Sequence, residues 1–162
     1  MKRQYSQINE LIGSKLIEIN MFSRSAQKVL LITGATESGY RYLKQYPTGP
    51  ARSYFQIETR TSYDIWQNYL RFRRSRRKKI VKACHLPDLW MKEIPEEQIH
   101  ADYLMSNLYF AICMARLVYW RVPKPLPPED DIAALGSYYI KYYNAGGKAT
   151  IKKWQEGYDL VK

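Results

Sequence analysis

Hydrophobic residues recur three or four positions apart over much of the chain, which is the spacing of one face of an α-helix. The first such run comprises Ile8, Leu11, Ile12, Leu16 and Ile19. A second helix is expected to begin at Ser23 or Ser25, either of which can cap it, and to end at Glu37-Ser38-Gly39, because glycine readily adopts the left-handed conformation that terminates helices. The segment 1–25 is expected to form an N-terminal helix that packs outside the core.

Prolines and capping residues divide the remainder of the chain into further segments. A loop is expected over residues 40–51, and Thr59 or Thr61 is expected to cap the helix that follows it. The other expected segments are, in chain order, an extended stretch at Tyr54–Ile57, a long helix over Glu96–Trp120, a stiff connector over Val122–Pro128, a helix from Asp130 or Asp131 to Tyr142 and a helix over Thr150–Leu160. The pattern predicts a bundle of six or seven helices, either all-α or α with a small β element.

The length and composition are typical of one folded domain, and with the helical pattern they predict a single, mainly α domain spanning residues 1–162. Hydrophobic residues make up 46% of the chain and charged residues 25%, which separates it from disordered proteins, and 162 residues suit one core. The 15 tyrosines are typical of surfaces that stack on sugars or pack against protein partners. The net charge of +11 favours polyanionic partners, namely nucleic acid, an acidic membrane surface or an anionic cell wall, and does not choose among them.

Much of the positive charge lies in the run Arg71–Lys79. Such a run usually forms a solvated helix face, and it can also bind nucleic acid or an acidic partner by neutralising charge. Because no recognisable nucleic-acid-reading motif accompanies it, we favour the solvated or protein-binding interpretation. A basic nucleic-acid-binding module is the weakest functional hypothesis.

The cysteines and histidines suggest neither a metal site nor a disulfide framework. Cys84, His85, His100 and Cys113 match no zinc spacing, so buried cysteines and incidental histidines are expected, with no metal and no cofactor. The N-terminus has no apolar core of a signal peptide, and no apolar run is long enough to span a bilayer. We therefore expect synthesis in a reducing compartment without a secretory signal.

Three segments together carry the candidate chemistry. They are Thr36–Gly39 (Thr-Glu-Ser-Gly), Gly49–Ile57 (Gly-Pro-Ala-Arg-Ser-Tyr-Phe-Gln-Ile) and Tyr142–Gly147 (Tyr-Tyr-Asn-Ala-Gly-Gly). Their order resembles that of the soluble lytic transglycosylases and goose-type lysozymes, in which a Glu-Ser pair ends a core helix and Gly-Leu-Met-Gln and Ala-Tyr-Asn-Ala-Gly segments follow. The sequence of these segments also resembles that of small lysozyme-like virion proteins of tailed phages. The resemblance covers residues 26–154 and implies a single lysozyme-like helical domain.

The resemblance implies that Glu37 is the catalytic acid/base for cutting a glycan strand. It also implies that Asn107 starts a helix. The residues it assigns to substrate binding are Ser38, Ser53, Phe55, Gln56, Asn107, Tyr143 and Asn144. Cleavage of a glycosidic bond requires a proton on the leaving oxygen, and a glutamate at the apolar end of a helix can retain its proton because burial raises its pKa. This family uses one carboxylate, with assistance from the substrate, and forms an anhydro sugar.

Several residues leave alternatives open. Where the family has Gly-Leu-Met-Gln, this chain has Ser53–Gln56 preceded by Arg52, and these side chains can fill or reshape the cleft. Glu58 and Asp64 are either second carboxylates or helix-capping residues. The closely spaced tyrosines either line a sugar cleft or pack ordinarily along a helix, and they are Tyr138, Tyr139, Tyr142 and Tyr143.

The leading hypothesis is a phage virion protein of the tail or baseplate that cleaves peptidoglycan with Glu37. Delivery within a virion assembled in the host cytoplasm would account for the missing signal. Its expected partners are the peptidoglycan glycan strand and other tail or baseplate proteins, with nucleic acid not expected. The alternative is a structural tail or baseplate component that keeps the fold and has lost the chemistry.

Overall fold

The computed structural model describes residues 3–162, so the first two residues of the predicted N-terminal segment lie outside it. The α-helices are α1 (Arg3–Glu18), α2 (Arg24–Ser38), α3 (Thr59–Asn68), α4 (Arg74–Ala83), α5 (Leu89–Lys92), α6 (Glu97–Ser106), α7 (Leu108–Trp120), α8 (Ile132–Tyr142) and α9 (Ile151–Val161). A 3₁₀ turn, η1 (Leu70–Phe72), precedes α4, and a two-stranded sheet pairs β1 (Ala51–Arg52) with β2 (Ile57–Glu58). The predicted fold class, mainly α with a small β element, is confirmed. The expected number of six or seven helices is too low, because the described part of the chain forms nine α-helices.

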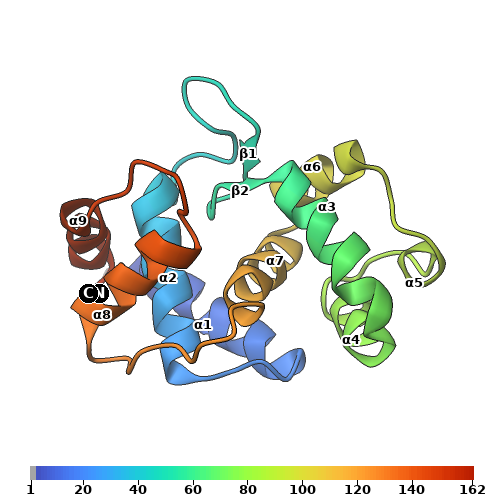
Figure 1. The fold of residues 1–162 in the computed structure, drawn as a ribbon, viewed down its shortest axis with the longest axis horizontal. Coiled ribbons are helices and arrows are strands. Elements are labelled where there is room, and N and C mark those ends of the chain that lie inside the picture. The colour runs from blue at the N-terminus through green and yellow to red at the C-terminus, as the bar shows by residue number, and fades with distance from the viewer. Residues whose placement is uncertain (1–2) are drawn as a thin grey trace.

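Helix α7 is the central element of the core. Figure 1 shows it between α2 on one side and α3 on the other, and its residues contact both helices. From Phe110 to Leu117 every residue of α7 is buried. Helix α1 also contacts α2 and α7, and its Ile12 and Leu16 are fully buried. Thus α1 belongs to the core and does not pack outside it.

The predicted helix ends are mostly confirmed by the capping geometry. The Ser23 hydroxyl accepts a hydrogen bond from the first turn of α2, and the Thr150 hydroxyl accepts one from the first turn of α9. The Asp131 carboxylate accepts one from the first turn of α8. Gly39 ends α2 with φ of 59°, in the left-handed region. The predicted capping of α3 by Thr59 or Thr61 is wrong. Glu58 occupies the N-cap position, and the Thr59 hydroxyl instead donates to the Pro50 carbonyl at 3.2 Å.

The single helix predicted over Glu96–Trp120 is two helices that meet at Asn107. This residue has extended backbone angles (φ −124°, ψ 97°), and its side-chain Oδ1 accepts from the Phe110 N–H at 3.0 Å. Its Nδ2 donates to the Cys84 carbonyl at 2.8 Å. The asparagine side chain thus replaces helical backbone bonds and starts α7 afresh. This confirms the placement of Asn107 at a helix start and corrects the long helix.

The small sheet is a hairpin in which Ala51 pairs with Glu58 and Arg52 with Ile57. Residues 53–56 form the turn, so the extended stretch predicted at Tyr54–Ile57 is present only at its last residue. Ser53 and Gln56 have φ of 67° and 47°, which places both in the left-handed region. The preceding loop projects from the helices (Figure 1), with residues 41–50 exposed.

Helix α9 packs closely along α2 and thereby fixes the end of the chain against the helix that carries Glu37. Gly157 makes this approach possible, because a Cβ atom there would lie 2.3 Å from the Thr36 hydroxyl and 3.0 Å from its backbone nitrogen. Trp154 is 1% exposed and donates from Nε1 to the Ile132 carbonyl at 2.8 Å. Helices α2, α8 and α9 therefore form one packed unit.

In the part of the chain that the structure describes, none of the helices combines the length and the apolar character that a bilayer crossing requires.

Candidate active site

A cavity of about 840 Å³ opens where α2, the hairpin, α3, the end of α7 and the turn after α8 meet. Its lining residues are Glu37, Gln56, Ile57, Glu58, Thr61, Val118, Arg121, Val122, Pro123 and Tyr142 to Gly147. Carboxylates, amides, a cation and tyrosine rings thus surround one space. This volume lies within the range of small-molecule sites, and the mixture of aromatic and polar groups suits a sugar chain.

Glu37 lies in the last turn of α2 and is held by two residues from the other end of the chain. The Tyr139 hydroxyl donates to Glu37 Oε1 at 2.6 Å, and Asn144 Nδ2 donates to the same oxygen at 3.3 Å. Among residues 3–162, no side chain donates a hydrogen bond to Oε2. The carboxyl group is therefore fixed through one oxygen, and the other is available to a ligand in the cavity.

Burial raises the pKa of Glu37 above its ordinary value of 4.5. The hydrogen bond from Tyr139, the positive charge of Lys153 and the hydrogen bond from Asn144 each act in the opposite direction, because they stabilise the carboxylate. Loss of solvent is the larger effect, so Glu37 keeps its proton to a higher pH than a free glutamate. This is the property required of a general acid.

Asn144 holds the turn after α8 as well as Glu37. Its Oδ1 accepts from the Ala149 backbone N–H at 3.2 Å while its Nδ2 donates to Glu37. Gly146 within this turn has φ of 79°, a conformation that glycine tolerates. The Asn144 side chain thus joins this turn to the Glu37 carboxyl.

Tyr139 lies in α8 and Tyr143 is the residue that caps its C-terminal end, and their rings stack at a centroid distance of 5.9 Å. The Tyr143 hydroxyl donates to the Phe55 carbonyl at 2.8 Å and so connects α8 to the hairpin turn. Tyr142 and Tyr143 line the cavity, whereas the Tyr138 hydroxyl donates to the Lys124 carbonyl. Tyr139 was considered as one of the tyrosines of a sugar cleft but was not assigned to the site, and its hydrogen bond to Glu37 was not predicted.

Four predicted site residues do not line the cavity. Phe55 is fully buried, and the Ser38 hydroxyl donates to the Tyr54 carbonyl at 2.8 Å. Ser53 is 1% exposed, and its hydroxyl accepts from the Phe55 N–H. Asn107 caps α7 beside Cys84. The structure gives these residues supporting positions and leaves Glu37, Gln56, Tyr143 and Asn144 at the cavity.

The unusual pair Arg52–Ser53 also lies away from the cavity. The Arg52 guanidinium donates to the Gly49 and Ala51 carbonyls, at 2.7 and 2.9 Å, and neither residue contributes to the cavity wall. The Gln56 amide donates to the Ser53 carbonyl at 2.7 Å, which leaves its own Oε1 for a ligand. The departure from the Gly-Leu-Met-Gln pattern therefore does not block the space beside Glu37.

Of the two possible second carboxylates, Glu58 lines the cavity and Asp64 does not. Asp64 accepts hydrogen bonds from Arg121 at 2.7 Å and from Asn68 at 2.6 Å. The pKa of Asp64 is lowered, and the hydrogen bond from Arg121 is the largest cause. Arg121 itself lines the cavity, and its buried Nε has no hydrogen-bond partner in the described chain. Glu58 remains the candidate second carboxylate.

A second hollow, which we call the cationic pocket, lies at the start of α4 and measures about 400 Å³. Its lining residues are Ile19, Asn20, Tyr69, Arg73, Arg74, Ser75, Arg76 and Lys79. Four cations and no carboxylate surround it. Arg77 is the exception in the basic run, because it is buried and donates to the Trp90 and Glu93 carbonyls.

The cysteines and histidines lie apart from the cavity. His100 is fully buried against aromatic rings, with Nδ1 2.9 Å from the Ser62 hydroxyl, and burial lowers its pKa to about 4. His85 is exposed. No three His, Cys, Asp or Glu side chains among residues 3–162 are grouped so as to hold a metal ion.

Comparison of the chain with protein families, with curated proteins and with solved structures found no match.

The raised pKa of Glu37 leads to a prediction about stability. Below pH 4.5 the carboxyl is protonated in both folded and unfolded chains, and as the pH rises the unfolded chain ionises first. The folded state binds the proton more tightly, so stability is lost as the pH rises through the folded-state pKa. As the pH rises, the free energy of unfolding of the wild type is expected to fall relative to that of Glu37→Gln. The expected fall is about 1.4 kcal/mol for each unit by which folding raises the pKa of Glu37.

Urea denaturation of both proteins from pH 4 to pH 8 measures this difference. Far-ultraviolet circular dichroism of each folded protein provides the control for structure. A difference that stays constant with pH, or that grows in favour of the wild type, would contradict a raised pKa.

Proposed function

We propose that this protein is a lysozyme-like, peptidoglycan-cleaving component of a phage tail or baseplate, with Glu37 as its general acid/base. The observation that carries the proposal is the half-buried Glu37 carboxyl at the cavity wall. Its Oε1 is fixed by Tyr139 and Asn144, and its Oε2 has no donor among residues 3–162. A positioned glutamate with a raised pKa is the group that glycoside cleavage requires.

In the proposed reaction, Glu37 donates its proton from Oε2 to the glycosidic oxygen of a bound glycan strand. The bond between that oxygen and the anomeric carbon breaks, and positive charge develops on the sugar. A hydroxyl of the same sugar then attacks the anomeric carbon and returns a proton to Glu37. Gln56 Oε1 and the tyrosine rings of the cavity hold the sugar, and Asn144 and Tyr139 keep the carboxyl in place.

Incubation of the folded protein with purified cell walls, followed by mass spectrometry of the released fragments, tests the proposal. We expect soluble muropeptides ending in an anhydro sugar, which is lighter by one water than a hydrolysis product. Ordinary reducing ends would instead indicate that water is the acceptor, with Glu58, the other glutamate that lines the cavity, as the candidate base. Release of no fragments by the folded protein would contradict the enzymatic function.

The structural alternative, a tail or baseplate component without activity, is favoured by the loop before β1. Tyr46 is 82% exposed there, and its ring stacks with that of the exposed Tyr42 at 6.3 Å. Exposed aromatic rings of this kind are typical of protein interfaces. The nucleic-acid alternative is supported by the net charge of +11 and by the cationic pocket, and salt-sensitive binding of DNA by the purified protein would favour it.

A further inference from the structure

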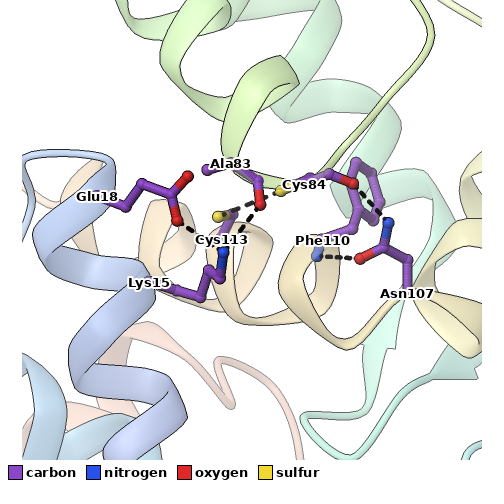
Figure 2. Close-up of polar contacts among 7 residues, drawn as sticks. All are labelled: Lys15, Glu18, Ala83, Cys84, Asn107, Phe110 and Cys113. Atoms are coloured by element: carbon purple, nitrogen blue, oxygen red, sulfur yellow. Dashed lines mark hydrogen bonds and ion pairs between the residues drawn. The ribbon is translucent and has the colours of Figure 1, made fainter.

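Outside the cavity, the two cysteines of the chain meet in the core. Cys84 follows the last turn of α4 and Cys113 lies within α7, and their sulfur atoms are 3.5 Å apart (Figure 2). Both side chains are fully buried, and both are free thiols. The sulfurs of a disulfide lie about 2.05 Å apart, so the two atoms need to approach by roughly 1.5 Å to form a bond.

The backbone around Cys84 is held in place on both sides of the pair, as Figure 2 shows. Lys15, from α1, donates to the Ala83 carbonyl at 3.2 Å and forms an ion pair with Glu18 at 2.6 Å. Asn107 donates to the Cys84 carbonyl at 2.8 Å from the start of α7. These contacts fix Cys84 against the helix that carries Cys113, so the sulfurs stay close in the folded protein.

This pair has no part in the proposed reaction. Neither cysteine lines the cavity, and neither belongs to a metal-binding group in the described residues. Contact with Cys113 and burial both raise the pKa of the Cys84 thiol, so in the closed protein this thiol is neutral and unreactive. Reaction requires a local opening, and Cys84 is the more easily exposed because it caps a helix end and precedes the exposed His85.

We propose that Cys84 and Cys113 form an intramolecular disulfide by exchange with a small-molecule disulfide. The Cys84 thiolate, formed when α4 frays, attacks one sulfur of the reagent and releases one small thiol. The Cys113 thiolate then attacks the Cys84 sulfur of the mixed disulfide and releases the second. The two protein thiols are oxidised, the reagent is reduced to two thiols, and their protons pass to these products.

The bond would join α4 to α7 and close the chain between residues 84 and 113. A cross-link restricts the unfolded chain, so the oxidised protein is expected to unfold at a temperature about 5–10 °C higher than the reduced protein. The protein would thus gain stability in oxidising surroundings. This inference is independent of the proposed cleavage of glycans.

The test uses the full chain, first reduced and then equilibrated with mixtures of reduced and oxidised glutathione. After acid quenching, denaturation and labelling with a maleimide, mass spectrometry is expected to show two labels on the reduced protein and none on the oxidised one. Proteolysis of the oxidised, monomeric protein should give one peptide pair joined through Cys84 and Cys113. Thermal unfolding of both forms measures the shift.

Cys84→Ser and Cys113→Ser are the matched controls, with the alanine variants as substitutes if either fails to fold. Each is expected to show no cross-link and no temperature shift on oxidation. The proposal is overturned if both thiols of the folded wild type remain labelled in a glutathione mixture that cross-links the same protein in mild denaturant. It is also overturned if only mixed disulfides with glutathione form, or if the control variants show the same shift.

Discussion

Glu37→Gln is expected to lower the rate of glycan cleavage by about 10²–10⁴-fold, the range for loss of a general acid. Glutamine has the same shape, and its side-chain oxygen still accepts the hydrogen bond from Tyr139, so the local structure is retained. The amide has no acidic proton to deliver to the leaving oxygen. The rate at which soluble muropeptides appear from purified cell walls measures the loss.

Two matched variants make this result specific. Glu10→Gln changes an exposed glutamate of α1 away from the cavity and is expected to leave the rate unchanged. Glu58→Gln changes the other glutamate of the cavity and is expected to cost less than Glu37→Gln if one carboxylate performs the reaction. Equal losses of cleavage rate in both cavity variants would indicate a two-carboxylate mechanism. Full activity in Glu37→Gln would exclude Glu37 as the general acid.

Trp154→Ala is expected to lower the free energy of unfolding by about 3–5 kcal/mol, the usual cost of removing a large buried aromatic side chain. The indole ring stacks on Tyr139 at a centroid distance of 5.0 Å and packs against Gly136, where a Cβ atom would lie 2.5 Å from it. Its removal leaves a cavity among α2, α8 and α9 and takes away the indole N–H that donates to the Ile132 carbonyl. Urea denaturation at pH 7 measures the change.

Ile151→Ala, at the first residue of the same helix, is the control. Its side chain is 47% exposed, so we expect a change of less than about 1 kcal/mol. Similar losses in both variants would indicate that α9 itself is weakly formed. A small loss in Trp154→Ala would contradict the packing of this unit.

Local signals in the sequence predicted the helices well where the chain carries its own cap. Ser23, Asp131 and Thr150 accept hydrogen bonds from residues close in sequence, so their positions alone locate the helix starts. The break at Asn107 was missed by the hydrophobic pattern because leucine and aromatic residues continue on both sides of it. Its stabilisation comes partly from the Cys84 carbonyl, a contact between distant residues that periodicity does not contain.

The site was predicted in part for a similar reason. Glu37, Gln56, Tyr143 and Asn144 follow from the order of motifs, and the structure brings them to one cavity. Tyr139 lies outside those motifs, and its hydrogen bond to Glu37 joins residues 102 positions apart. Ser53 was expected in the cleft because of the motif it occupies, whereas its left-handed backbone turns the side chain into the protein.

The dependence of Glu37 on Tyr139 and Asn144 has a consequence for the newly made chain. As the ribosome extends the polypeptide, α2 emerges more than 100 residues before the partners that enclose its carboxyl. Until α8 and α9 have been synthesised and have docked on α2, Glu37 is a solvated glutamate without a fixed orientation. The nascent protein is therefore inactive in the proposed reaction until α8 and the turn after it have reached α2.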